Sequence, residues 1–198
     1  MRTKTKALVL ALCAVLLVVA SVMGTMAYLT SQDTVTNTFT VGKVAITLDE
    51  AKVDEYGAVD ATASSRVKSN TYKLIPGHNY TKDPTVHFVK DSEASYLFVK
   101  VENGLANIEA ESNNIASQII ANGWAELTGV ANVYYKKVDR NGGNTAVDYP
   151  VFGTFTLSDD AAVADYAQAN ISVTAYAVQA DNFATAQAAW EAAKFPIN

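Results

Sequence analysis

Hydrophobic and polar residues alternate along several stretches of the chain, as they do in β-strands with one buried face. Within residues 43–49, Val44, Ile46 and Leu48 share one face, and polar or small residues occupy the positions between them. Residues 84–90 and 95–103 continue the pattern, and 91–93 between them predict a hairpin loop. The same reasoning places further strands at residues 71–75, 124–127, 133–138, 147–157 and 171–179.

Three segments carry helix signals instead. Ser112 is placed to cap a short helix with isoleucines at helical spacing, which Asn122 and Gly123 close. Ser158, followed by two aspartates, resembles a second helix start. The last helix is expected in residues 181–195, where Phe183, Ala186, Trp190 and Ala193 form an apolar stripe that should dock on a sheet, with Pro196 ending the helix.

Together these elements predict the fold class. Seven or more short strands with Gly-, Asn- and Asp-rich turns between them indicate a mostly β protein, a β-sandwich of the jelly-roll or Ig-like kind. Two or three short helices would lie at its periphery. Residues 50–70 are small and polar with weak periodicity, so we expect an irregular excursion there that ends at the turn formed by Pro76 and Gly77.

The N-terminus has the layout of a secretory signal peptide. Three basic residues precede an unbroken apolar stretch at 7–20, and small residues stand at Thr25 and Ala27. We therefore expect cleavage between Ala27 and Tyr28, with residues 1–27 as signal peptide and 28–198 as a single domain. A single membrane anchor is the alternative, because the apolar stretch approaches the length that spans a bilayer.

Net charge limits the possible partners of the predicted mature protein, and cysteine content limits how its fold can be stabilised. The chain has 15 Lys and Arg against 20 Asp and Glu, and three of the basic residues lie in the signal, so the remainder carries a formal charge of −8. Such a protein should avoid nucleic acid and anionic lipid. The one cysteine, Cys13, leaves with the signal, so the domain must be stabilised by packing rather than by disulfides. We expect a secreted protein without a stable membrane anchor after cleavage.

The candidate catalytic chemistry is sparse. The chain has two histidines, His78 and His87, and no HExxH motif, so a zinc site would have to be completed by Asp83, Asp91 or Glu93. A turn histidine and a strand histidine are the favoured interpretation. No GxSxG elbow or phosphate-binding glycine loop is present. We therefore expect no enzyme activity, no catalytic residue, no metal site and no cofactor.

Two further patterns have both a functional and a structural interpretation. Residues 139–150 faintly resemble a calcium loop, but Gly143 and Pro150 stand where oxygen ligands belong, so a hairpin turn is favoured. Tyrosines are frequent and would suit a carbohydrate-binding face, although aromatic residues are also common in strands. They are Tyr28, Tyr56, Tyr72, Tyr80, Tyr96, Tyr134, Tyr135, Tyr149, Tyr166 and Tyr176.

The segment around the predicted cleavage site carries a family resemblance. Ala27 before Tyr28, a polar spacer, and Asn37-Thr38-Phe39-Thr40-x-Gly42 running into an alternating strand resemble the start of the TasA/camelysin family of Gram-positive bacteria. Residues 75–86, 95–103 and 171–183 are similar to its central and closing parts. The resemblance implies cleavage by a SipW-type signal peptidase and a jelly-roll-like subunit of the biofilm matrix that forms fibres by handing its N-terminal segment to a neighbour. Camelysin itself is described as a metalloprotease.

Residues 28–41 have the character of such a donated strand. Val35, Asn37, Phe39 and Val41 alternate with threonines, and Gly42 provides a hinge to the first firm strand. A free strand of this kind can complete the exposed sheet edge of another subunit. Pairing within its own subunit is the alternative, and the sequence leaves both open.

The leading hypothesis from sequence is a non-enzymatic, secreted matrix subunit that associates with itself into fibres, meets a signal peptidase during export, and has an accessory matrix protein as a further partner. Its alternatives are a carbohydrate-binding or adhesive β-sandwich and a camelysin-like metalloprotease.

Overall fold

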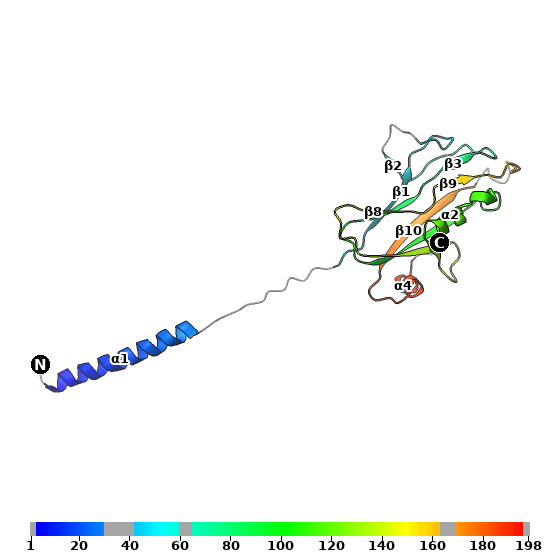
Figure 1. Cartoon of the computed structure of the whole chain (residues 1–198). Coiled ribbons are helices and arrows are strands. Elements are labelled where there is room, and N and C mark those ends of the chain that lie inside the picture. The colour runs from blue at the N-terminus through cyan, green and yellow to red at the C-terminus, as the bar shows by residue number, and fades with distance from the viewer. Residues whose placement is uncertain (1–2, 30–41, 60–64, 163–168, 196–198) are drawn as a thin grey trace. The chain divides into compact units, whose positions relative to one another are not determined.

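The computed structural model describes residues 3–29, 42–59, 65–162 and 169–195 of the chain (Figure 1). The chain has two compact units, Met1–Thr40 and Val41–Asn198. The first unit contains helix α1 (Thr3–Leu29), whose window Thr3–Ala20 has a mean hydropathy of 2.0. A helix this apolar near the N-terminus is compatible with a signal peptide, and by length and composition also with a membrane span.

Two four-stranded antiparallel sheets form the framework of the second unit, with a two-stranded sheet beside them. The first has the order β2 (Arg66–Val67), β1 (Ile46–Ala51), β4 (Thr85–Phe88) and β8 (Val147–Pro150). The second has the order β10 (Ile171–Gln179), β5 (Ser95–Asn103), β7 (Val133–Val138) and β6 (Ala125–Glu126). The two-stranded sheet pairs β3 (Asn79–Thr81) with β9 (Thr154–Thr156). The helical elements are η1 (Glu111–Asn113), α2 (Ile115–Ala121) and α4 (Ala186–Ala193).

The main core lies between the two four-stranded sheets. Val86 and Phe88 of β4 are fully buried in the same cluster as Leu97 and Val99 of β5. Alternation explains the arrangement, because every second residue of each strand points to the same side. The predicted mostly β sandwich is therefore confirmed, whereas the jelly-roll connectivity stays a prediction.

A second, smaller core covers the other face of the β5 sheet. Tyr96 and Phe98 point away from the main core, and the ring of Trp190 on α4 packs 5.1 Å from that of Phe98. The predicted docking of the last helix on a sheet is confirmed. Strand β5 is thus buried on both faces, which accounts for its nearly continuous run of apolar residues. Thr185 caps α4 by accepting from the Ala188 backbone N–H.

Two predicted hairpins are wrong, because each connection passes from one sheet to the other. Residues 91–93 join β4 to β5, and residues 139–146 join β7 to β8, and in each case the strands belong to different sheets. The buried side chain of Asn141 determines this geometry: its amide donates to the Phe88 carbonyl, 3.0 Å away, and its backbone exchanges hydrogen bonds with Asp91 and Ser92. Asn141 thereby ties the two crossings together at one end of the sandwich.

The strand predicted at 147–157 is interrupted. It forms β8 and then β9, which leaves the first sheet and pairs with β3, so that the rings of Phe155 and Tyr80 stack 4.9 Å apart. Residues 71–75 are not a strand either. The Tyr80 hydroxyl donates to the Lys73 carbonyl and accepts from the Ile75 N–H, so side-chain bonds satisfy that backbone. Strands β2 and β3 lie where no strand was expected.

The helix boundaries also required correction. Asn114, not Ser112, caps α2, because its side chain accepts from the Ser117 N–H, and Ser112 lies in η1. Gly123 ends that helix with φ +78°, as predicted. Ser158 does not start a helix within 158–162, where the two aspartates form a turn, and residues 163–168 lie outside the described part.

Candidate functional site

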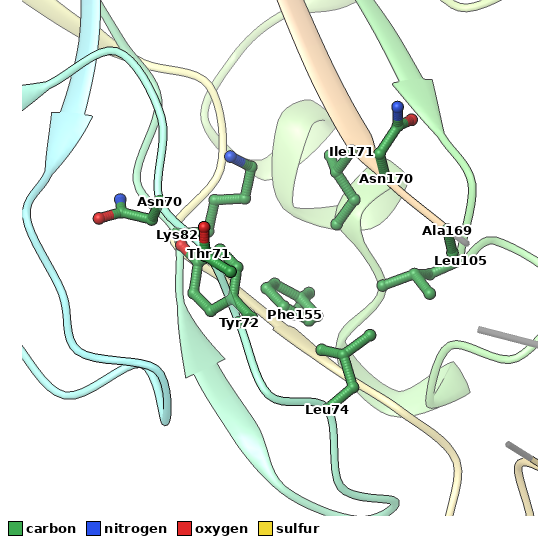
Figure 2. A pocket seen from close by; sticks show the side chains of 10 residues that line it. All are labelled: Asn70, Thr71, Tyr72, Leu74, Lys82, Leu105, Phe155, Ala169, Asn170 and Ile171. Atoms are coloured by element: carbon green, nitrogen blue, oxygen red, sulfur yellow. The ribbon is translucent and has the colours of Figure 1, made fainter. Parts of the chain in front are cut away.

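Strand β10 borders a groove at one side of the sandwich. It pairs with β5 on one edge, and no described strand pairs with its other edge. Two adjoining cavities of about 260 and 480 Å³ follow that edge and share Asn70, Lys82 and Ile171 in their walls. Figure 2 shows the smaller of the two. Residues 171–175 form one wall, and residues 48–50 and 68–70 face them. The groove therefore lies between β10 and the outer edge of β1.

A buried ionic cluster lies against this groove. The ammonium of Lys82 is 2.5 Å from Oε2 of Glu50, and only 11% and 6% of the two side chains are exposed. The other carboxylate oxygen, Oε1, accepts from the amide of Asn70 at 2.9 Å. Glu50 is in phase with Leu48 along β1, so alternation points it to the inside of the sandwich. A charge held this far from water requires such partners.

The Asn70 side chain is held at both ends of its amide. Its Oδ1 accepts from the Val53 N–H at 3.1 Å, and its Nδ2 also donates to the Ala51 carbonyl at 2.9 Å. Tyr72 lies nearby, and burial together with the negative charge of Glu50 raises the pKa of its phenol above the ordinary value. Glu50, Lys82 and Asn70 thus bring a carboxylate, an amine and an amide together at the groove in fixed positions.

The outer face of the same sheet carries a second cluster, partly exposed to solvent, in which the exposed fraction ranges from 16% for His87 to 63% for Asp148. His87 lies on β4 between two carboxylates: its Nε2 is 2.8 Å from Asp49 on β1, and its Nδ1 is 2.5 Å from Asp148 on β8. Arg66 on β2 also bonds Asp49, and its other nitrogen reaches Asp83 at 3.0 Å. The cluster therefore links four successive segments of the first sheet through their side chains.

The charges in this outer cluster shift one another's pKa. Burial alone would lower the pKa of His87, but hydrogen bonds and charge from Asp49 and Asp148 outweigh it and raise the pKa above the usual 6.5. For Asp49, burial opposes ionisation, while the bonds from His87 and Arg66 prevail and lower its pKa below 3.8. The imidazole is therefore held as a cation between two anions over a wider pH range than a free histidine.

The two histidines that a zinc site would have required, and for which no metal site was predicted, have separate partners. His78 bonds the Tyr56 carbonyl at 2.9 Å and packs its ring against Tyr80, whereas both nitrogens of His87 are engaged by carboxylates. Within the described ranges no group of three or more His, Cys, Asp or Glu side chains is placed to hold a metal ion. Asp83 is paired with Arg66 instead.

The other predicted site residues fall in two places. Ala27 and Tyr28 lie within α1, and Val35, Asn37, Phe39 and Val41 lie outside the described residues. Gly42 is described and exposed. Just after it, Lys43 forms a parallel bridge with Ser92, and its carbonyl accepts from the Glu93 N–H at 2.8 Å. The chain is therefore attached to the sandwich from Lys43 onward.

The tyrosines of the described part serve mainly in packing. Seven of them belong to the two cores or pack against them, and Tyr56 is exposed. The packed ones are Tyr72, Tyr80, Tyr96, Tyr134, Tyr135, Tyr149 and Tyr176.

Sequence analysis missed the cluster of Glu50, Asn70 and Lys82. Glu50 and Asn70 bound the segment interpreted as an irregular excursion, and Lys82 is 32 residues away from Glu50. A signal was nevertheless present, because Glu50 continues the apolar face of residues 44–48 at the period of two. A carboxylate on an apolar face implies a buried partner.

Comparison of the chain with protein-family models, with curated proteins and with solved structures finds no match.

Proposed function

We propose that this chain is a secreted, non-enzymatic subunit of an extracellular biofilm matrix, which assembles into fibres when residues 28–41 of one subunit pair with a sheet edge of the next. The observation that carries the proposal is the edge of β10 beside a groove, with which no strand of the described residues pairs. A strand edge offers backbone donors and acceptors to an incoming extended segment.

The groove has the features that a donated strand needs. Its wall on β10 combines Ile171, Val173 and Ala175, which face the main core, with the open backbone edge. On the opposite wall, β2 pairs only with Glu50 and Ala51, so the more N-terminal part of β1 has no described strand on that side. A strand that pairs with β10 here would have to displace part of β1, because Cα atoms of the two strands already lie within 8 Å of each other, and its apolar side chains would reach the core.

The length of the free segment fits transfer between subunits. Residues 28–41 precede Lys43, where the chain becomes attached to the sandwich, so the predicted cut would leave a segment free at its front end. Extended chain spans roughly 3.3 Å per residue, which gives residues 28–41 a reach of about 45 Å. Donation from subunit to subunit does not close on itself unless the rotation produces a ring, so it generates filaments.

Electron microscopy of the secreted protein tests the proposal directly. Protein that begins at Tyr28 should form fibres over time, and deletion of residues 28–41 should leave a folded monomer. Phe39→Asp should weaken polymerisation because it brings a charge against the apolar residues of the main core. Fibres of unchanged form from the deletion variant, or its unfolding, would exclude strand donation.

A cysteine pair distinguishes donation between subunits from pairing within one. Because Cys13 is the only cysteine and lies in the predicted signal, one preparation can carry Thr38→Cys and another Ser172→Cys without other thiols. Mixed under oxidising conditions, the two should form a disulfide dimer. Thr145→Cys, in the exposed connection between β7 and β8, is the matched control for Ser172→Cys. It should not form a disulfide with Thr38→Cys. Equal disulfide formation at Ser172→Cys and Thr145→Cys would indicate random collision between subunits instead of strand donation.

A further inference from the structure

We propose that Lys82 and Asn70 form an intramolecular amide bond, with Glu50 as the proton-transferring catalyst. This inference rests on the buried cluster beside the groove and is independent of fibre assembly. The product would be a covalent cross-link between side chains in a domain whose predicted mature chain has no cysteine.

The three side chains have the arrangement that this reaction needs. One carboxylate holds both nitrogens, with Lys82 Nζ 2.5 Å from Oε2 and Asn70 Nδ2 2.9 Å from Oε1 of Glu50. The nucleophile and the amide are thus fixed on the same catalytic group, which replaces a chance encounter by a constant proximity. Figure 2 shows Asn70 and Lys82 on neighbouring segments that line the same cavity.

The proton that must move already lies between its two groups. Lys82 Nζ donates to Oε2 of Glu50 at 2.5 Å, so its transfer to the carboxylate needs no rearrangement of either side chain. Transfer leaves an uncharged amine with a free lone pair and a carboxylic acid, the two species that acyl transfer requires.

The reaction balances without a further reagent. The Nζ lone pair attacks Cγ of Asn70, and the electrons of the C=O double bond move to Oδ1. The Val53 N–H, already 3.1 Å from Oδ1, stabilises the negative charge that develops there. Glu50 gives its proton to Nδ2, the Cγ–Nδ2 bond breaks, and ammonia departs. The resulting carboxylate takes the surplus proton from Nζ and passes it to ammonia, which leaves as ammonium through the adjoining cavities.

Peptide mapping of the secreted protein tests the bond. A linked Lys82 resists trypsin, so residues 69–73 should appear joined to residues 74–90 with a mass lower by one ammonia. Fragmentation should place the bond between Asn70 and Lys82. Separate peptides 69–73, 74–82 and 83–90 would overturn the proposal. Loss of water instead of ammonia would also overturn it, because that mass places the bond on the carboxyl group of Glu50.

Three variants assign the roles. Glu50→Gln retains the amine and the amide but cannot shuttle the proton, so the linked peptide should disappear or form many-fold more slowly. Lys82→Arg should abolish it. The matched control is Lys68→Arg, whose ammonium bonds the Leu48 carbonyl in the same groove, and this variant should link as the wild type does. A linked peptide in Glu50→Gln at the wild-type rate would exclude Glu50 as the catalyst. The wild-type peptide map decides the existence of the bond even where a variant fails to fold.

Discussion

Asp49 and Glu50 are adjacent carboxylates on β1, yet the fold gives them opposite surroundings. Glu50 faces the inside of the sandwich, with 6% of its side chain exposed and Lys82 as its cation. Asp49 faces outward and shares its charge with His87 and Arg66 at the edge of solvent. The difference arises from the period of two in an extended strand, which sends neighbouring residues to opposite faces.

The comparison shows how burial changes the value of an ion pair. A charge buried without its partner costs several kcal/mol, because neither water nor a counterion compensates it. An exposed pair is worth roughly 0–1 kcal/mol, since water and salt screen it. The two faces of one strand therefore predict very different effects for similar substitutions.

Removing the cation of the inner pair should have the largest effect. Compared with wild-type protein in which Lys82 is still unlinked, Lys82→Met keeps most of the side-chain volume but leaves the Glu50 carboxylate buried without a counterion. We expect a loss of about 3–5 kcal/mol in the free energy of unfolding. Denaturant titration followed by tryptophan fluorescence measures it. A loss below about 1 kcal/mol would mean that water reaches Glu50 and that the inner pair behaves as a surface pair.

Replacing both partners of the inner pair should recover much of that loss. In Glu50→Leu/Lys82→Met no buried charge remains, and Asn70 keeps its bond to the Ala51 carbonyl at 2.9 Å. We expect the double variant to be more stable than Lys82→Met alone by about 2 kcal/mol or more. The same titration on both proteins checks this, and equal stability would show that packing, not charge, limits the single variant.

The sequence predicted strand β1, but not the different surroundings of Asp49 and Glu50 on its two faces. Alternation identified residues 43–49 as a half-buried strand, and similar reasoning located most of β5, β7, β10 and α4. These elements are recognisable because each presents an apolar face at a regular period over six or more residues.

What sequence could not predict depends on contacts between distant segments. Asn141 determines where the chain crosses between sheets, and its partner Phe88 is 53 residues away. The groove forms only because β10 and β1 lie at the same side of the sandwich. Short strands such as β2 and β3 have too few residues to show a period. They form because they pair with the backbones of β1 and β9.

On the outer face, His87→Gln should produce a smaller, pH-dependent change. Because the pKa of His87 is raised in the folded protein, its stabilising contribution is complete below the unfolded value near 6.5 and is lost as pH rises through the folded value. We expect the stability of the wild type to fall, by on the order of 1 kcal/mol, as pH rises above about 6.5 and through the raised folded pKa, and His87→Gln to show a flatter dependence.

Denaturation midpoints across that pH range measure the slope. His78→Gln is the matched control, because it also removes an imidazole, but one that lies outside the outer cluster and bonds the Tyr56 carbonyl at 2.9 Å. If the pH dependence of stability in His87→Gln has the wild-type slope, the charge of His87 does not stabilise the outer cluster.

The smallest effect is expected where solvent is most accessible. Asp148 has 63% of its side chain exposed, so its pair with His87 is strongly screened, and Asp148→Ala should cost no more than about 0.5 kcal/mol. The pH slope should decrease without disappearing, because Asp49 still faces the imidazole at 2.8 Å.

Asp49→Ala should cost more than Asp148→Ala, since it also removes the partner of Arg66. Unfolding titrations near pH 6 in low salt, repeated in high salt, measure both variants, because salt should reduce the exposed pair first. If Asp148→Ala proves as costly as Lys82→Met, exposure does not determine the strength of these pairs, and the contrast between the two faces of β1 fails.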